Sequence, residues 1–159
     1  SKQEAEKAVL LLKDMGVHCL IEQPRYNMFE RTPEDGLFKA MWEHGVGCIC
    51  YSPLAQGALT DKYLNGIPQG SRASRVGTTI NDRYLSEEKL DQIRRLNEIA
   101  VSRNQSLAQM ALAWVLREKA VTSVLIGASS VRQLENSVQC LDHLEFSADE
   151  LKAIDEILK

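Results

Sequence analysis

The apolar residues of this chain fall partly at helical spacing and partly in short continuous runs. From Ser1 to Met15 they recur three and four positions apart, and Gly16 follows where a helix commonly ends. Residues 17–22, 46–51 and 121–126 are short, mostly apolar runs, which are typical of strands buried in a parallel sheet. Further helices are predicted over residues 33–43 and from Ser86, Ser106, Ser130 and Ser147 onward.

Three of these helix starts have the spacing of a capping box. In such a box a serine and a glutamine or glutamate three residues later exchange hydrogen bonds between side chain and backbone. The pairs are Ser106 with Gln109, Ser130 with Gln133, and Ser147 with Glu150. The sequence therefore predicts that three helices begin directly after these serines.

Strands that alternate with helices indicate parallel pairing and an α/β fold. Three strands with five or six helices are an incomplete set, because a parallel sheet buries both faces and this one leaves an edge open. We therefore expect residues 1–159 to form a single partial domain of a larger fold.

Residues 52–85 show no sustained period and contain Gly57, Gly66, Gly70 and Gly77. Loops of this length inside a compact domain are uncommon and tend to be functional. Four Lys and Arg against two Asp make the loop basic, whereas the whole chain has a net charge of −3. A basic loop on an acidic body favours an anionic ligand.

The composition argues against several classes of function. The charge balance does not support a nucleic-acid partner, and no apolar run approaches the roughly 20 residues that cross a bilayer. The amino end lacks the order of a secretory signal, so a cytoplasmic protein without a membrane partner is expected.

The four cysteines form no Cys-x-x-Cys pair and are predicted to be small buried hydrophobes, with no metal site. Cys48 and Cys50 would share one face of a strand, a poor geometry for a disulfide.

Three segments at the carboxyl ends of the predicted strands could hold a phosphate. Neither a Gly-x-Gly-x-x-Gly nor a P-loop motif is present. Gly127-Ala128-Ser129 leads into a helix whose first N–H groups favour anions, although such starts are commonly only caps. Residues 51–57 could leave the N–H groups of Leu54 and Gln56 free, or form an ordinary turn. Residues 23–27 are the third segment, at the edge where parallel α/β sheets bind ligands.

Five ordered motifs in the chain together resemble the aldo-keto reductase superfamily. They are Gln23-Pro24-x-Tyr26-Asn27, Tyr51-Ser52-Pro53-Leu54-Ala55-x-Gly57, Lys62-Tyr63, Gly66-Ile67-Pro68-x-x-Ser71-Arg72-Ala73 and Leu125-Ile126-Gly127-Ala128-Ser129-x-x-x-Gln133-Leu134. The resemblance covers essentially the whole chain. It is greatest to the branch that holds bacterial L-glyceraldehyde 3-phosphate reductases and the beta subunits of voltage-gated potassium channels. It implies the second half of a (β/α)8 TIM barrel, entered at the helix before the sixth strand.

The resemblance also implies that this half supplies most of an NADPH site. Gln23 would hydrogen-bond the nicotinamide carboxamide, and Tyr51 would stack against the ring. The pyrophosphate would be lined by Ser52, Pro53, Leu54, Gln56 and Gly57, under a strap that carries Lys62 and Arg72. The 2′-phosphate and adenosine would be held by Gly127, Ser129 and Gln133.

Two features depart from the family pattern. Where relatives carry Glu-Asn near the adenine, the ungapped match places Asn136-Ser137, because a one-residue deletion would rotate the helix by about 100°. The catalytic tyrosine, lysine, aspartate and histidine belong to the first half of the barrel, and none can be assigned here. His18, His44 and His143 are expected to be packed or solvated.

The resemblance implies that the complete polypeptide reduces an aldehyde or a ketone to an alcohol with NADPH. Its partners would be a small carbonyl substrate and the missing N-terminal half of the barrel. Assembly into a homo-oligomer is compatible with the resemblance. The alternative is a redox-sensing regulatory subunit resembling potassium channel beta subunits. A truncated interaction module without cofactor is the third hypothesis, which the open sheet edge disfavours.

Overall fold

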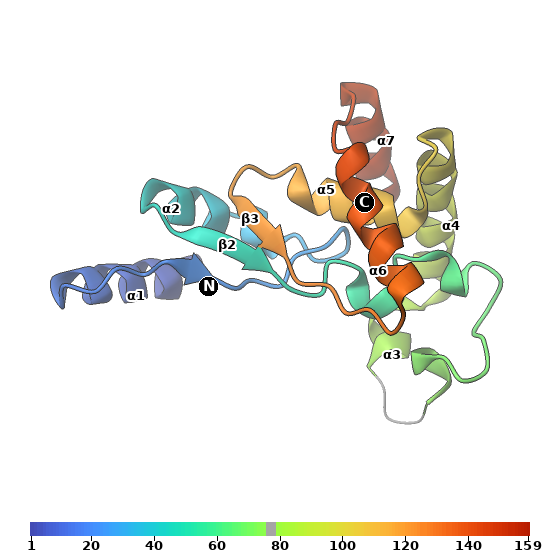
Figure 1. Cartoon of the computed structure of the whole chain (residues 1–159), viewed down its shortest axis with the longest axis horizontal. Helices are drawn as coiled ribbons and strands as arrows, with labels where there is room; N and C mark the ends of the chain where they lie inside the picture. Colours follow the sequence, from blue (N-terminus) through green and yellow to red (C-terminus); the bar gives the residue numbers. More distant parts are fainter. Residues whose placement is uncertain (76–78) are drawn as a thin grey trace.

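The computed structural model describes residues 1–75 and 79–159, apart from the side chains of Arg72 and Asp82. Helices and strands alternate first, and the chain ends in helices (Figure 1). The elements, in chain order, are α1 Lys2–Asp14, β1 Ile21–Glu22, α2 Leu37–Glu43, β2 Gly47–Cys50, α3 Ile80–Tyr84, α4 Glu87–Ser102, α5 Leu107–Leu116, β3 Val121–Val124, α6 Val131–Val138 and α7 Ala148–Leu158.

The three strands form one parallel sheet in the order β1-β2-β3. Ile21 lies opposite Gly47, and the β2–β3 pair contains an irregularity between Cys48 and Ile49. Parallel neighbours require a crossover connection, and a helix lies in each one. The predicted α/β fold with three parallel strands flanked by helices is thus confirmed, and it is consistent with part of a (β/α)8 barrel.

Two predicted elements are shorter than expected. The first strand pairs only over Ile21–Glu22, and Val17, at the start of the predicted strand, instead donates its N–H to the carbonyl of Leu12 and completes the end of α1. The helix predicted over residues 33–43 is divided into a 3-10 turn, Thr32–Glu34, and α2. Gly36 lies between them with φ +101°, a conformation that interrupts a right-handed helix.

The core lies between the sheet and the helices that cover one of its faces. Cys48 and Cys50 are fully buried on that face, as the alternation along β2 requires. All four cysteines are free, and burial raises the pKa of Cys48 to about 11 and of Cys50 to about 12. These thiols therefore stay protonated and pack as small hydrophobes.

Figure 1 shows α4 to α7 gathered on one side of the molecule and α1 with α2 at the opposite end. Within the described ranges, β1 and β3 each pair with one strand only, so both edges of the sheet are open. Large apolar side chains are exposed on both sides of the sheet in the chain order. They are Leu10, Leu11, Met15, Val17, Leu20 and Ile21 on α1, the segment after it and β1, and Leu125, Val131, Leu134 and Val138 on the segment after β3 and on α6. In the part of the chain that is described, no helix combines the length and the apolarity needed to cross a bilayer.

Candidate cofactor site

The carboxyl ends of the three strands are joined by backbone hydrogen bonds. Tyr51 donates its N–H to the carbonyl of Pro24 at 3.0 Å, and Tyr26 donates to the carbonyl of Tyr51 at 3.3 Å. On the other side, Leu125 donates to the carbonyl of Cys50 at 2.8 Å. The structure therefore brings all three candidate segments to one edge of the sheet.

Strand alternation places the side chains of this edge on the face opposite the buried cysteines. Tyr51 continues the half-buried positions Gly47 and Ile49, while Cys48 and Cys50 point into the core. Its ring is partly accessible, as stacking on a flat heteroaromatic ring requires. The exposed Gln23 precedes the buried Pro24 at the end of β1, so an accessible amide and an accessible ring stand on neighbouring strands.

The loop after β2 holds unusual backbone conformations. Ser52, Ala55 and Gln56 have φ values of +55°, +48° and +60°, and Asn104 is the one other non-glycine residue with positive φ in the described ranges. Such conformations cost about 1–3 kcal/mol each and cluster at functional sites. The predicted pyrophosphate segment is thus the most strained part of the described backbone.

Asn27 holds the start of this loop. Its wholly buried side chain donates from Nδ2 to the Ser52 carbonyl at 3.0 Å and accepts from the Phe29 N–H at 2.9 Å. Sequence reasoning assigned no role to Asn27. The available signal was one polar residue between the apolar Tyr26 and Met28, since buried polar groups are almost always hydrogen-bonded.

The same loop presents backbone donors. The N–H groups of Ala55 and Gly57 bond to the carbonyls of Ser52 and Leu54, whereas those of Leu54 and Gln56 have no acceptor among the described residues. Two free N–H groups in a left-handed loop form a concave donor surface that suits an anion. Pro53, which precedes Leu54, is buried and contributes no donor.

The basic loop returns over this segment. The side chain of Gln56 donates to the Thr79 hydroxyl at 3.3 Å, next to α3. Lys62 is exposed, and its backbone N–H is capped by Thr60. The predicted strap residue Arg72 has its side chain outside the described part, and the loop residue Gly77 lies outside the described residues.

The third segment leads into α6 and is fully exposed at Gly127, Ser129 and Gln133. Gln133 donates its N–H to the Ser130 hydroxyl, but its side chain accepts from the Ser129 N–H at 2.8 Å and the Ser129 hydroxyl at 3.0 Å. The predicted box between Ser130 and Gln133 is therefore half wrong, because Ser129 offers two donors where Ser130 would offer one. Within the described chain, the first N–H groups of α6, at Val131 and Arg132, have no acceptor.

Asn136 is already engaged in the fold. Its Oδ1 accepts from Gln109 Nε2 at 3.2 Å, and its Nδ2 donates to the Ser106 hydroxyl at 3.2 Å. These bonds tie α6 to the start of α5. A contact between Asn136 and adenine stays a prediction, and it would require giving up part of this network.

Two of the tyrosine hydroxyls are already bonded to carboxylates of the fold. The hydroxyls of Tyr26 and Tyr84 donate to Glu34 and Glu30, each at 2.6 Å, and burial raises the pKa of Tyr84 to about 12. His18, His44 and His143 are exposed. The described residues also contain no cluster of three histidine, cysteine or acidic side chains that could hold a metal.

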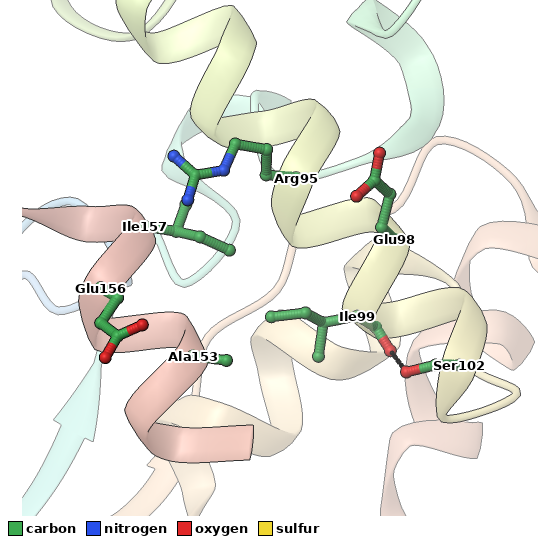
Figure 2. A pocket seen from close by; sticks show the side chains of 7 residues that line it. All are labelled: Arg95, Glu98, Ile99, Ser102, Ala153, Glu156 and Ile157. Carbon is green, nitrogen blue, oxygen red and sulfur yellow. Dashed lines mark hydrogen bonds between the residues drawn. The ribbon is translucent and has the colours of Figure 1, made fainter. Parts of the chain in front are cut away.

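A surface groove of about 390 Å³ lies between α4 and α7, away from the strand ends. Figure 2 shows its lining of Arg95, Glu98, Ile99, Ser102, Ala153, Glu156 and Ile157. The Ser102 hydroxyl donates to the Ile99 carbonyl at 2.7 Å and is thereby satisfied within its own helix. None of the predicted cofactor residues lines this groove, so we assign the candidate site to the strand ends.

Comparison with known proteins shows to which proteins this chain is similar. The chain is 49% identical over 160 residues to L-glyceraldehyde 3-phosphate reductase of Escherichia coli K12, covering 98% of this chain and 46% of that protein. It is 37% identical over 142 residues to a protein named as a voltage-gated potassium channel subunit beta of Schizosaccharomyces pombe, covering 86% of this chain and 41% of that protein. The chain thus spans about half the length of the curated relatives it matches.

The model of the aldo/keto reductase family matches residues 1–159. The match includes all three strands, the loop after β2 and the start of α6. The chain belongs to the aldo/keto reductase family, an oxidoreductase family.

Proposed function

We propose that the complete polypeptide reduces an aldehyde or a ketone to the alcohol with NADPH, and that this chain supplies most of the cofactor site. The observation that carries the proposal is the meeting of three donor-rich segments at the carboxyl edge of one parallel sheet. Family membership and the reductase name of the Escherichia coli relative support it.

The residues present fit a dinucleotide with an extra phosphate. The free N–H groups of Leu54 and Gln56 suit a pyrophosphate, and those of Val131 and Arg132 at the start of α6 suit a second phosphate. The two donor pairs follow neighbouring strands, β2 and β3, and the partly accessible Tyr51 ring lies at the end of β2.

When bound, the cofactor supplies the hydride for the reaction. This chain would orient it: Tyr51 through stacking, Gln23 through its amide, and Lys62 and Arg72 through their charge over the loop. The proton donor would come from the other half of the barrel, so residues 1–159 alone are expected to bind NADPH weakly and to catalyse no reduction.

That other half is the partner we propose for the open edges of the sheet. Unpaired strand edges with exposed apolar side chains beside them are unfavourable in water, and closing a barrel removes them. The chain's coverage of about half of its relatives is consistent with this.

The test uses the polypeptide that contains both halves. NADPH and NADH dissociation constants are measured by fluorescence titration, and consumption of NADPH is followed with a panel of aldehydes and ketones. We expect tighter binding of NADPH than of NADH, together with carbonyl-dependent oxidation. Equal dissociation constants for NADPH and NADH would contradict the proposal. NADPH oxidation at the same rate with and without an aldehyde or ketone would contradict it as well.

A second candidate function is a regulatory subunit whose bound cofactor reports the redox state. The similarity to the channel subunit beta of Schizosaccharomyces pombe favours it. The two candidates differ in turnover. Steady oxidation over many cycles indicates the enzyme, whereas a single rapid oxidation followed by very slow release of the cofactor indicates the sensor.

A further inference from the structure

A group of charged side chains stands beside Tyr51 and takes no part in the cofactor contacts described above. Arg25 and Arg83 both approach the same oxygen of Glu30, at 3.5 Å from Nη1 and from Nε respectively. The hydroxyl of Tyr84 donates to that same oxygen at 2.6 Å. One carboxylate therefore faces two guanidinium groups, and the group keeps a net positive charge.

The position of Arg25 makes this charge relevant to the candidate site. Arg25 is bridged to Tyr51 in the sheet, and its guanidinium lies 5.3 Å from the centre of the Tyr51 ring. Arg25 lies two positions after Gln23, so alternation places both on the same face. A fixed cation thus stands beside the ring against which the nicotinamide is proposed to stack.

The donors of Arg25 are not used up. Its Nη1 lies 3.5 Å from Glu30, which is longer than a charge-assisted hydrogen bond. Its Nε is buried without a hydrogen-bond partner in the part of the chain that the structure describes, so the terminal nitrogens are the donors that a ligand could reach. The side chain is 29% exposed and that of Arg83 is 47% exposed, so both can be reached from solvent. A guanidinium with spare donors matches the paired oxygens of a phosphate or a carboxylate.

We propose that Arg25 and Arg83 bind the negatively charged group of the carbonyl substrate, and so give the reaction a preference for phosphorylated or carboxylated aldehydes over neutral ones. The proposal rests on the proposed reductase function. Bound cofactor phosphates share this chemistry, but two other sets of free donors already suit them, at Leu54 and Gln56 and at the start of α6. We therefore assign the arginine pair to the substrate.

The experiment compares glyceraldehyde 3-phosphate with glyceraldehyde, which differ only in the phosphate, in the polypeptide that contains both halves of the barrel. The readout is the ratio of kcat/KM for the two substrates. Arg25→Gln and Arg83→Gln are each expected to lower this ratio by about tenfold to a hundredfold, as loss of a charged hydrogen bond does. Arg25→Lys keeps the charge and should restore part of the ratio.

Two further arms make the result specific. Glu30→Gln removes the competing carboxylate and keeps an acceptor for Tyr84, so the ratio should rise. Arg95→Gln is the matched control, because Arg95 lines the groove between α4 and α7 and should leave the ratio unchanged. Raising the ionic strength should reduce the wild-type preference, since part of it is electrostatic.

The outcomes separate this inference from the proposed function. Oxidation of NADPH with glyceraldehyde but no gain with its phosphate overturns the inference and leaves the reductase intact. An unchanged ratio with a weaker NADPH dissociation constant in Arg25→Gln and Arg83→Gln also overturns it, and assigns the pair to a cofactor phosphate. Absence of carbonyl-dependent oxidation overturns the proposed function and this inference with it.

Discussion

The buried amide of Asn27 donates to the carbonyl oxygen of Ser52 at 3.0 Å, and so ties the end of the first strand segment to the first left-handed residue of the loop after β2. A strained backbone persists only where its surroundings hold it. Asn27 is such a support, and it connects the fold to the donors at Leu54 and Gln56.

Asn27→Ala should therefore affect stability and cofactor binding together. The Ser52 carbonyl and the Phe29 N–H would each lose a buried partner, which costs about 1–3 kcal/mol of unfolding free energy. Relaxation of the loop should also weaken NADPH binding. Urea denaturation and fluorescence titration measure the two effects, with the exposed Asn65→Ala as control. Wild-type affinity in a destabilised Asn27→Ala protein would show that the loop does not depend on this bond.

Gly57→Ala tests the backbone of the same loop without a steric clash. Gly57 has φ +98°, and an added Cβ would meet nothing within 4 Å. The cost should therefore be conformational, about 1–2 kcal/mol of unfolding free energy. Gly127→Ala is the matched control, since its Cβ would also meet open space and its φ lies outside the left-handed range. Equal losses of stability in the two variants would refute the conformational explanation.

The lowered pKa of Glu34 predicts that the unfolding free energy decreases in acid. Burial opposes ionisation, but hydrogen bonds from Arg31 and Tyr26 outweigh it and hold the pKa of Glu34 below its ordinary value of 4.5. The pKa of Glu34 is lower in the folded than in the unfolded chain. The contribution of the Glu34 carboxylate to the unfolding free energy is therefore complete above the unfolded pKa. It is lost as the pH falls below about 4.5 and through the folded pKa.

In Glu34→Gln the unfolding free energy at neutral pH should fall by about 1–3 kcal/mol, and its decline between neutral and acidic pH should become shallower. Urea denaturation over a pH series measures both quantities. Glu43→Gln is the control, because Glu43 is exposed and pairs with Lys39 at 3.8 Å. A pH profile in Glu34→Gln that matches the wild type would assign the acid sensitivity to other carboxylates.

Gln133→Ala tests the adenosine end of the site. Its carboxamide orders Ser129 through two hydrogen bonds, and the family resemblance places it at the 2′-phosphate. NADPH binding should weaken about tenfold, whereas NADH binding should change little because NADH lacks that phosphate. Gln139→Ala provides the control, as that carboxamide contacts Gln109 instead. Parallel losses for NADPH and NADH would place Gln133 away from the 2′-phosphate.

The sequence predicted those elements that local chemistry determines. The serines at positions 86, 106 and 147 are the N-caps of α4, α5 and α7, because a cap depends on residues three positions apart. Apolar runs separated by helices likewise predicted the parallel sheet. These features need no knowledge of distant contacts.

The features that sequence reasoning missed depend on long-range contacts. The left-handed conformations of Ser52 and Ala55 are held by the fold, and neither residue type favours them. Arg25 and Arg83 are far apart in the chain and meet only because both approach Glu30. Val17, predicted in the first strand, instead makes a hydrogen bond back to α1.

Tyr51 offers a test of the nicotinamide end that separates the contribution of the aromatic ring from that of its hydroxyl. Tyr51→Phe keeps an aromatic ring directly after β2, and Tyr51→Ala removes it. Aromatic stacking contributes about 0.5–1.5 kcal/mol beyond buried area, so Tyr51→Ala should slow hydride transfer several-fold in single-turnover measurements. Tyr51→Phe should remain near the wild-type rate. Because the adenosine end is held by a different strand end, the NADPH dissociation constant should change less than the rate. Equal rates in the alanine and phenylalanine variants would mean that the ring does not stack on the reacting group, and would place the nicotinamide elsewhere along this edge.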